Sequence, residues 1–258
     1  MKLNRCVINK SRFLIWGLTA LIAGSLTISG CSKPKDTFEN FESSNLRVIN
    51  GFPWADNVKF YLDEFNLTRL GYINYQSVST PSYYVVKAGA RNAAFYSEDT
   101  ESKFAEKSIQ LEQGKDYTLF LTGSQDNPEF ILTADDLTEA PADQAKIRIA
   151  NLALTGGDVR VTIQKTDIMS PKPEVTIFDG VGEKTISGYI STPVPVSKGN
   201  ALFQNHTVRV YDANTNQLLT ELEGVDLRAT TINTIVIYGD RSGSPELYVQ
   251  TLGEWLDW

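Results

Sequence analysis

The sequence predicts an all-β fold built from two tandem immunoglobulin-like (Greek-key) β-sandwich domains. Three observations support this prediction. Short segments alternate apolar and polar residues with a period of two, glycine and proline separate them, and the spacing recurs in the second half of the chain. Of the 258 residues, 41% are hydrophobic and 21% charged, which is typical of a folded globular protein. No amphipathic helix of more than two turns is predicted.

The first 30 residues have the pattern of an export signal. They contain four basic residues and no acidic residue, followed by an apolar run over 13–28. That run is shorter than the ~20 apolar residues of a membrane-spanning helix, so a cleaved signal is the better interpretation. The tetrapeptide Ile28-Ser29-Gly30-Cys31 resembles the lipobox of bacterial lipoproteins. The resemblance implies that residues 1–30 are removed and that Cys31 is acylated, for example with palmitate.

Removal of the signal would change the net charge from −7 to −11. Such a chain is repelled by anionic lipid headgroups, so we expect the lipid on Cys31 to hold it to the membrane. Residue Ser32 after the cysteine resembles an outer-membrane sorting signal of enteric bacteria. We therefore expect an outer membrane lipoprotein of a Gram-negative bacterium, facing the periplasm or the cell surface, with residues 31–45 as a lipidated tether. The other cysteine, Cys6, lies in the signal, which leaves no thiol for a disulfide or a metal site.

Strands are predicted throughout the first half of the body. Turn residues such as Gly51, Gly89 and Gly123 separate them. The predicted strands are Leu46–Ile49, Val58–Leu62, Tyr83–Val86, Ala93–Tyr96, Ser108–Leu111, Tyr117–Leu121 and Glu129–Leu132.

The second half repeats the first. Leu46–Asn50 matches Ile147–Asn151 at an offset of 101 residues, and Gly123 matches Gly239 at an offset of 116. Matching segments keep their order while the offset grows, as loop insertions would produce. This pattern predicts a first β-sandwich repeat over 46–133, an acidic linker over 134–145 and a second repeat with an aromatic C-terminus over 146–258.

Several segments carry a resemblance to a known family. The opening "VRVVHASPDAP-VDVYVDG", the turn "VPAG" and the closing "AGK-YTL-V-TG" of that family are similar to Leu46–Tyr61, Lys87–Gly89 and Leu111–Gly123, and Ala145–Asn151 repeats the opening. The chain therefore resembles the bacterial family called domain of unknown function 4397. The second half departs from the pattern, because Ala229–Thr234 replaces the "GKxYT" block. The resemblance implies a secreted or lipid-anchored tandem β-sandwich protein, and it implies no activity.

Catalytic and metal-binding patterns are weak. His206 is the only histidine and is expected at a surface or strand edge, with no Gly-x-Ser-x-Gly nucleophile to serve. The oxygen ligands of Asp212–Glu223 follow calcium-loop spacing, but Gln217 replaces the required glycine and the flanks alternate like strands, so a hairpin turn is expected. No metal site and no cofactor are predicted. The acidic charge balance argues against nucleic acid as a partner.

Adjacent acidic residues could in principle hydrolyse glycosides, as a pair of carboxylates does. In a chain this acidic they are expected to lie in loops for solvation instead. The three pairs are Asp63-Glu64, Glu98-Asp99 and Asp135-Asp136.

Aromatic residues supply the candidate binding site. Phe52 and Trp54 lie in the loop after the first predicted strand, where a ring could stack on a sugar or anchor a partner. The alternative is a hydrophobic plug at one end of the sandwich. Strand alternation predicts that one of Tyr83 and Tyr84 is a core residue. The C-terminal segment 254–258 is expected to pack on the second domain or to dock on another chain.

The expected function is that of a non-catalytic binding or structural module of the cell envelope, with a glycan or protein ligand. Loops on a rigid sandwich are suited to recognition. The alternatives are an adhesin-like or accessory subunit of an envelope assembly and, less favoured, a carboxylate-dependent hydrolase.

Overall fold

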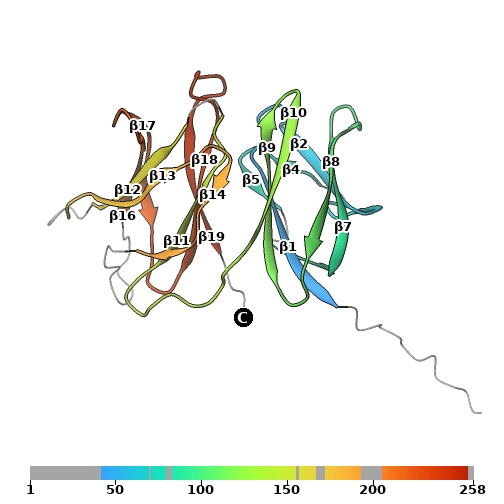
Figure 1. Cartoon of the computed structure of the whole chain (residues 1–258), viewed down its shortest axis with the longest axis horizontal. Helices are drawn as coiled ribbons and strands as arrows, with labels where there is room; N and C mark the ends of the chain where they lie inside the picture. Colours follow the sequence, from blue (N-terminus) through green and yellow to red (C-terminus); the bar gives the residue numbers. More distant parts are fainter. Residues whose placement is uncertain are drawn as a thin grey trace, which may run out of the picture. The chain divides into compact units, whose positions relative to one another are not determined.

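The computed structural model describes residues 42–69, 71–79, 83–154, 157–166, 172–192 and 205–254. These residues lie in one compact unit and contain strands and turns but no helix. The strands form four sheets (Figure 1). The all-β sandwich fold is therefore confirmed.

Two sheets enclose the core of the first half. One has the strand order β10–β9–β1–β5 with β6 also paired to β1, and the other has the order β3–β2–β7–β8 with β4 also paired to β2. Each predicted strand of this half overlaps an observed one. The strands are β1 (Ser43–Asn50), β2 (Asn57–Leu62), β3 (Phe65–Asn66), β4 (Ile73–Asn74), β5 (Ser77–Val78), β6 (Tyr84–Lys87), β7 (Gly89–Ser97), β8 (Lys103–Leu111), β9 (Asp116–Ser124) and β10 (Asn127–Ala134).

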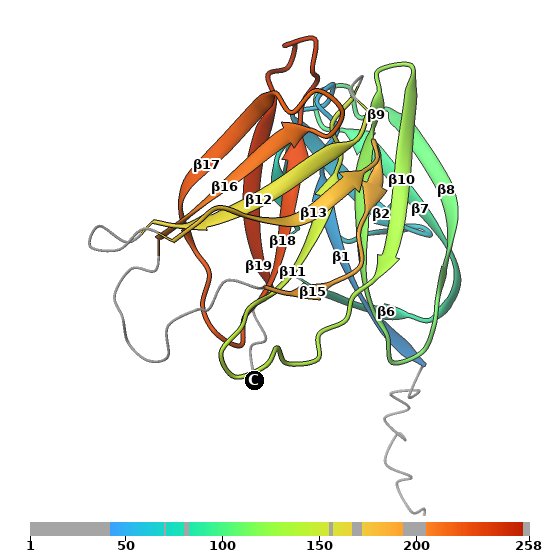
Figure 2. The same ribbon diagram turned by 60° about the vertical axis from the view of Figure 1, so that its left-hand side comes forward.

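Two further sheets enclose the core of the second half. Their orders are β14–β11–β18–β19, with β15 also paired to β11, and β13–β12–β16–β17, which comes forward in Figure 2. The strands are β11 (Lys146–Asn151), β12 (Val159–Lys165), β13 (Val175–Val181), β14 (Thr185–Ile186), β15 (Ile190–Ser191), β16 (Asn205–Asp212), β17 (Leu218–Asp226), β18 (Ile232–Tyr238) and β19 (Tyr248–Glu254).

Residue alternation determines which side chains form the cores. In β2, Val58, Phe60 and Leu62 are buried, and the residues between them are half-buried. In β6, Tyr84 and Val86 are buried while Val85 is exposed, which confirms that one tyrosine of the pair belongs to the core. The apolar face of each strand thus points between the two sheets of its sandwich.

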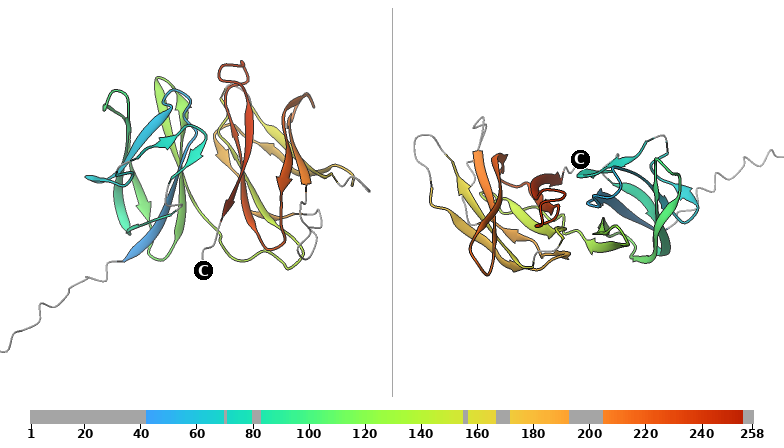
Figure 3. Two further views of the ribbon diagram at one scale, coloured as in Figure 1. Left: turned by 180° about the vertical axis from the view of Figure 1, so that it is seen from behind. Right: turned by 90° about the horizontal axis from the view of Figure 1, so that it is seen from above.

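The strand pairings of the two halves correspond. In the first half β1 pairs in parallel with β9, with Leu46 opposite Tyr117; in the second half β11 pairs in parallel with β18, with Ile147 opposite Asn233. The other pairs among the strands that the structure describes are antiparallel. Both views of Figure 3 separate the blue-to-green strands of residues 43–134 from the yellow-to-red strands of residues 146–254.

The matched sequence positions have matched structural roles. The side-chain oxygen of Asn50 accepts a hydrogen bond from the Phe52 N–H, and that of Asn151 accepts one from the Ala153 N–H. Gly123 and Gly239 have φ of 106° and 97°. A Cβ at Gly123 would lie 2.3 Å from the backbone oxygen of Asn127, and a Cβ at Gly239 would lie 2.3 Å from that of Glu246, so only glycine fits at either position. The recurring motif residues are therefore turn-forming residues.

A third apolar cluster joins the two halves. Strands β9 and β18 are buried on both faces, because one face lines a sandwich core and the other packs against the opposite half. This second face holds Ile49, Phe120, Ala150, Leu152, Val236 and Tyr238. The Thr122 hydroxyl donates a hydrogen bond of 3.1 Å to the Leu152 carbonyl across the joint. The sandwiches are thus packed face to face.

A buried ion pair lies beside this cluster and corrects the expectation of solvated acid pairs. Asp135 follows β10, and its carboxylate is fully buried, 2.7 Å from Nη1 of the buried Arg148. The hydroxyls of Tyr83 and Thr118 each donate a 2.7 Å hydrogen bond to the second oxygen of Asp135. Arg148 also donates to Thr118, at 3.1 Å. Asp135 can be buried rather than exposed in a loop, because a cation and two hydroxyl groups replace the water that would solvate its carboxylate.

Candidate ligand-binding groove

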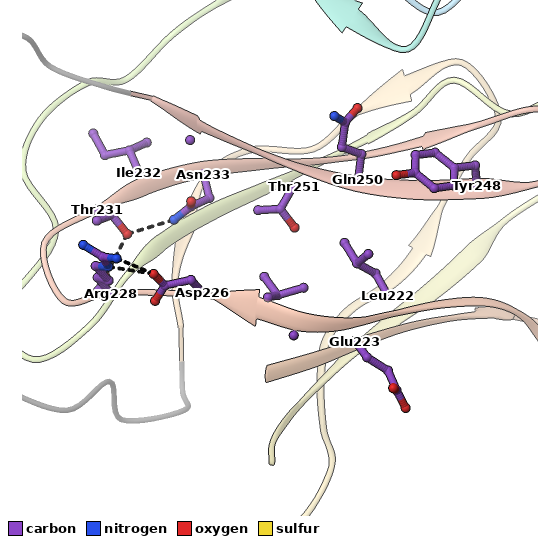
Figure 4. Close-up of a pocket in the computed structure, with 13 residues that line it drawn as sticks. Leu222, Glu223, Asp226, Arg228, Thr231, Ile232, Asn233, Tyr248, Gln250 and Thr251 are labelled. Carbon is purple, nitrogen blue, oxygen red and sulfur yellow. Dashed lines mark hydrogen bonds and ion pairs between the residues drawn. The ribbon is translucent and has the colours of Figure 1, made fainter. Parts of the chain in front are cut away.

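A groove lies between β17 and β19, the edge strands of the two sheets in the second sandwich (Figure 4). Its volume is about 450 Å³, which is within the range of small-molecule sites. Its walls come from consecutive residues of β17, from β19, from the start of β18 and from the turn between β17 and β18. The residues that line it include Leu222, Glu223, Asp226, Arg228, Thr231, Asn233, Tyr248, Gln250 and Thr251.

The first sandwich has a depression at the equivalent place, between its edge strands β8 and β10. Its volume is about 380 Å³, and its lining is confined to those two strands, with Ile109, Phe130 and Leu132 as apolar members. In the second sandwich the groove extends further, to β18 and the preceding turn. The two halves therefore differ in the reach and chemistry of this seam.

Strand register identifies the residues responsible for the difference. Leu132 pairs with Leu119, and Thr251 pairs with Ile235 at the corresponding position, so Thr251 stands where the first half has Leu132. By the same reasoning Asn233 stands where the first half has Tyr117. Tyr117 is buried in the first core, and its hydroxyl accepts a 3.2 Å hydrogen bond from the Glu112 N–H. A short amide and a hydroxyl thus replace two large apolar side chains.

Two polar atoms at the groove have no hydrogen-bond partner among the described residues. They are the buried side-chain oxygens of Gln250 and Thr251, which point to opposite faces of β19. Thr251 lies on the core face beside Ile235, and Gln250 lies on the face that carries Val236 of the cluster joining the two halves. A buried polar atom without a partner costs about 1–3 kcal/mol, and such atoms are rare in native proteins unless a ligand or water satisfies them. In contrast, the amide of Asn233 donates a 3.0 Å hydrogen bond to the Thr231 hydroxyl.

Charged groups flank one end of the groove. Arg228 donates to Asp226 at 2.8 Å and forms an ion pair of 2.6 Å with it, and this carboxylate raises the pKa of Arg228. The neighbouring Thr230 has φ of 68°, a left-handed conformation that is unfavourable for a β-branched residue. In the first half Gly114 occupies the equivalent position with the same φ of 68°. Local backbone strain of this kind concentrates at functional sites.

A β-bulge shapes the wall formed by β17. His206 pairs with Val225 and Val208 pairs with Leu222, so Glu223 and Gly224 together stand opposite Thr207. Gly224 has φ of 73°, and this left-handed conformation favours glycine. A bulge disturbs the regular spacing of backbone hydrogen-bonding groups along an edge, so β17 is a poor template for an added strand.

The two aromatic residues predicted to bind a ligand have different environments. Phe52 is 3% exposed and its ring stacks on Phe104 at 5.3 Å, so it is a packing residue of the first core. Trp54 is 44% exposed in the same loop. The burial of Phe52 argues against direct ligand contact by its side chain, and the prediction for Trp54 stays a prediction.

We expected His206 at a surface or strand edge. That prediction is wrong, because His206 is fully buried in the inner strand β16. Its position among the apolar residues of the second core explains the error, because the sequence does not show which strands are central. Asp212 is the last residue of β16, where the hairpin turn begins. Its carboxylate accepts backbone hydrogen bonds from Asn214 and Thr215 and one from the Arg241 side chain.

Several predicted features lie outside the described residues: the signal over 1–30, Cys31, most of the tether and residues 255–258. Within the described ranges, no group of three or more histidine, cysteine or acidic residues is placed to hold a metal ion. Among the same residues no helix is long and apolar enough to cross a membrane.

Sequence reasoning did not find the groove. The signal was present, because the "GKxYT" block that the second half lacks contains Tyr117, the residue replaced by Asn233.

Comparisons with known proteins support the family resemblance over part of the chain. A family model described as "Domain of unknown function (DUF4397)" matches residues 44–162, which cover the first sandwich and extend to β12. No curated protein matches the chain. Two solved structures with low similarity are a "putative cell adhesion protein" from Bacteroides uniformis ATCC 8492 and the family 26 carbohydrate-binding module CBMbc of Eubacterium rectale Amy13K, determined with maltoheptaose. Their identities are 11% and 12% and their TM-scores 0.27 and 0.24, and each match covers 83% of this chain and 98% of the other. The family resemblance inferred from the opening, turn and closing motifs is thus confirmed over residues 44–162.

Proposed function

We propose that this protein is a non-catalytic binding module that holds a small polar ligand in the groove between β17 and β19. The observation that carries the proposal is the replacement of Tyr117 and Leu132 of the first sandwich by Asn233 and Thr251 at equivalent positions of the second. A scaffold that can fill this seam with apolar side chains instead presents polar ones there, at a cost in stability that a ligand would offset.

The chemistry of the lining favours binding over catalysis. Hydroxyl and amide groups do not change protonation state near neutral pH, so Thr251 and Asn233 can position a ligand but cannot act as acid–base catalysts. Of the two lining carboxylates, Asp226 is paired with Arg228 and Glu223 is exposed to solvent.

Thermal-shift screening against soluble amino acids, nucleosides, sugars and short peptides tests the groove. A compound that binds should raise the Tm of the wild-type protein. The gain should be lost in Thr251→Val, which removes the hydroxyl at nearly constant volume, and in Thr251→Leu, which restores the residue of the first half. Thr176→Leu, at an exposed site on β13, is the matched control and should keep the gain. Equal shifts in wild type and both Thr251 variants would exclude the groove as the site.

We further propose that the two sandwiches are copies of one unit and that the mature protein begins at an acylated Cys31. The basic start, the Ile28–Cys31 tetrapeptide and Ser32 support an outer-membrane lipoprotein. Metabolic labelling with radioactive palmitate tests this anchoring: we expect labelled protein in the membrane fraction and no label in Cys31→Ser. Labelling that survives this substitution would overturn the assignment.

Trp54 is proposed as a separate ligand contact on the first sandwich, because a large ring that is 44% exposed can stack on a ligand. Trp54→Ala should abolish the Tm gain from a compound whose gain survives in Thr251→Val, while leaving stability within about 0.5 kcal/mol of wild type. If every such compound still binds a folded Trp54→Ala variant, Trp54 is not a ligand contact.

A further inference from the structure

Two exposed aromatic side chains lie on adjoining segments at one end of the first sandwich. Trp54, in the loop between β1 and β2, is 44% exposed, and Tyr72, just before β4, is 48% exposed. The side-chain amide of Asn50 donates hydrogen bonds to the carbonyls of Ala55, at 3.2 Å, and Ile73, at 3.1 Å. Because each aromatic residue directly precedes one of these carbonyls, a single amide holds the two segments side by side.

The loop that carries Trp54 is anchored at its base. The buried ring of Phe52 stacks on Phe104 of β8 at 5.3 Å, and Pro53 restricts the backbone between Phe52 and Trp54. A side chain on an anchored segment loses less conformational freedom when it binds a partner. The position of Trp54 is therefore suited to recognition.

Acidic residues surround the two aromatic residues. The Asn57 carbonyl accepts a 3.1 Å hydrogen bond from the Glu98 N–H, which places the hairpin between β7 and β8 beside this loop. Figure 1 shows the loop and the hairpin at the same end of the sandwich. Lys59 is the one basic residue in segments 51–59, 71–75 and 97–102, and it pairs with Glu101 at 3.4 Å. The acidic residues of these segments are Asp56, Glu98, Asp99 and Glu101.

The second sandwich forms the same amide clamp without aromatic residues. Asn151, the equivalent of Asn50, donates to the carbonyls of Val181 and Gly182 at 3.1 and 3.0 Å. The segments that it joins, 152–158 and 180–184, contain no phenylalanine, tyrosine or tryptophan. The clamp therefore does not require the exposed rings of the first half.

We infer that this end of the first sandwich binds a basic segment of a partner protein, with Trp54 and Tyr72 against its lysine or arginine side chains. The faces of aromatic rings attract cations, and arginine also stacks on them. The surrounding carboxylates attract the same cations and repel acidic segments. The inference rests on the proposed role of Trp54 as a ligand contact and specifies the ligand of that contact.

Isothermal titration calorimetry with short peptides tests the inference. The probes are hexa-arginine and hexalysine, with hexaglutamate and a glycine–serine hexapeptide as comparisons. We expect a basic peptide to bind more tightly than either comparison, and Trp54→Ala and Tyr72→Ala each to weaken its binding about fivefold. Phe65→Ala is the matched control, because it removes a 73% exposed ring at the other end of β2 and should leave the affinity unchanged.

A second pair of variants separates this site from general attraction to an acidic chain. Asp56→Asn with Asp99→Asn removes two carboxylates beside the rings and should weaken binding of the basic peptide. Glu112→Gln with Glu139→Gln changes the net charge equally at exposed residues outside these segments and should weaken binding less. An equal loss in the two double variants would overturn the inference.

The remaining outcomes separate the inference from the proposed role of Trp54. If basic peptides bind no better than the comparisons while a screened compound loses its Tm gain in Trp54→Ala, Trp54 is a ligand contact and the basic partner is wrong. If the basic peptides bind wild type, Trp54→Ala and Tyr72→Ala equally, the inference is overturned. If neither a peptide nor a screened compound distinguishes wild type from Trp54→Ala, both proposals fail. Trp54→Phe, which keeps an aromatic face, should retain most of the affinity, and thermal unfolding verifies that each variant is folded.

Discussion

The two sandwiches of this chain have corresponding strand orders, but they differ in the side chains between the edge strands of their two sheets. In the first, Tyr117 and Leu132 pack against an apolar core that also contains Phe52 and Phe130. In the second, Asn233 and Thr251 occupy the same register positions and line the groove between β17 and β19. The first half thus serves as an internal reference for how the scaffold packs at these two positions.

The two halves are in contact at their joint, and we expect the largest loss in the free energy of unfolding from a substitution there. Asp135→Ala would leave the buried Arg148 without its carboxylate, and loss of one partner of a buried ion pair costs about 3–5 kcal/mol. Urea unfolding followed by fluorescence measures the loss, and two separated transitions would show that the halves unfold independently. Asp143→Ala, at an exposed residue of the linker, is the control. A change below about 1 kcal/mol in Asp135→Ala would show that the pair does not hold the joint.

Exchanging the seam residues tests the comparison directly. Leu132→Thr places a hydroxyl against the apolar first core and should lower the free energy of unfolding by about 2 kcal/mol. The reverse change, Thr251→Leu, removes a buried hydroxyl without a partner and should raise stability by about 1 kcal/mol. Equilibrium unfolding in urea measures both. If Thr251→Leu were as destabilising as Leu132→Thr, threonine at position 251 would not lower the stability of the protein relative to leucine.

A smaller effect is expected at the turn before β18. Thr230→Gly should stabilise the protein by about 1 kcal/mol, because glycine adopts the φ of 68° without the steric cost that threonine pays. The reverse exchange at the equivalent position of the first half, Gly114→Thr, should destabilise the protein by a similar amount. Thermal unfolding detects both changes. A destabilised Thr230→Gly variant would mean that contacts of the threonine side chain outweigh its backbone strain.

The sequence predicted the scaffold well because the scaffold depends on local patterns. Alternation located every predicted strand of the first half, and the recurring asparagines and glycines proved to be turn residues whose backbone environment admits little else. The site was harder to predict, because Asn233 and Thr251 belong to different strands and meet only through sheet pairing. His206 and Asp135 were misplaced for the same reason, since their burial is created by strands and side chains distant in sequence.

Two carboxyl groups with similarly low pKa values provide the finest test, because the causes differ. The pKa of Asp136 falls from 3.8 to about 2, chiefly through its hydrogen bond with Lys146 near the joint. The pKa of Asp212 falls to about 2 chiefly through the backbone N–H of Thr215 in the second sandwich. Since both values are lower in the folded than in the unfolded protein, each group contributes stability that is present above pH 4 and lost as the pH falls through about 2.

Substituting Lys146 by methionine should separate these two causes. In Lys146→Met the pKa of Asp136 should return toward 3.8, while that of Asp212 should stay near 2 because its backbone donors are untouched. Carboxyl-detected NMR titration from pH 6 to pH 2 measures both groups in one sample. Added salt should also raise the pKa of the half-exposed Asp136, because mobile ions screen its attraction to Lys146, and should affect Asp212 less. An equal rise at both carboxyls in Lys146→Met would instead indicate that the substitution loosens the two sandwiches together, and the halves could then no longer be treated as independent references for one another.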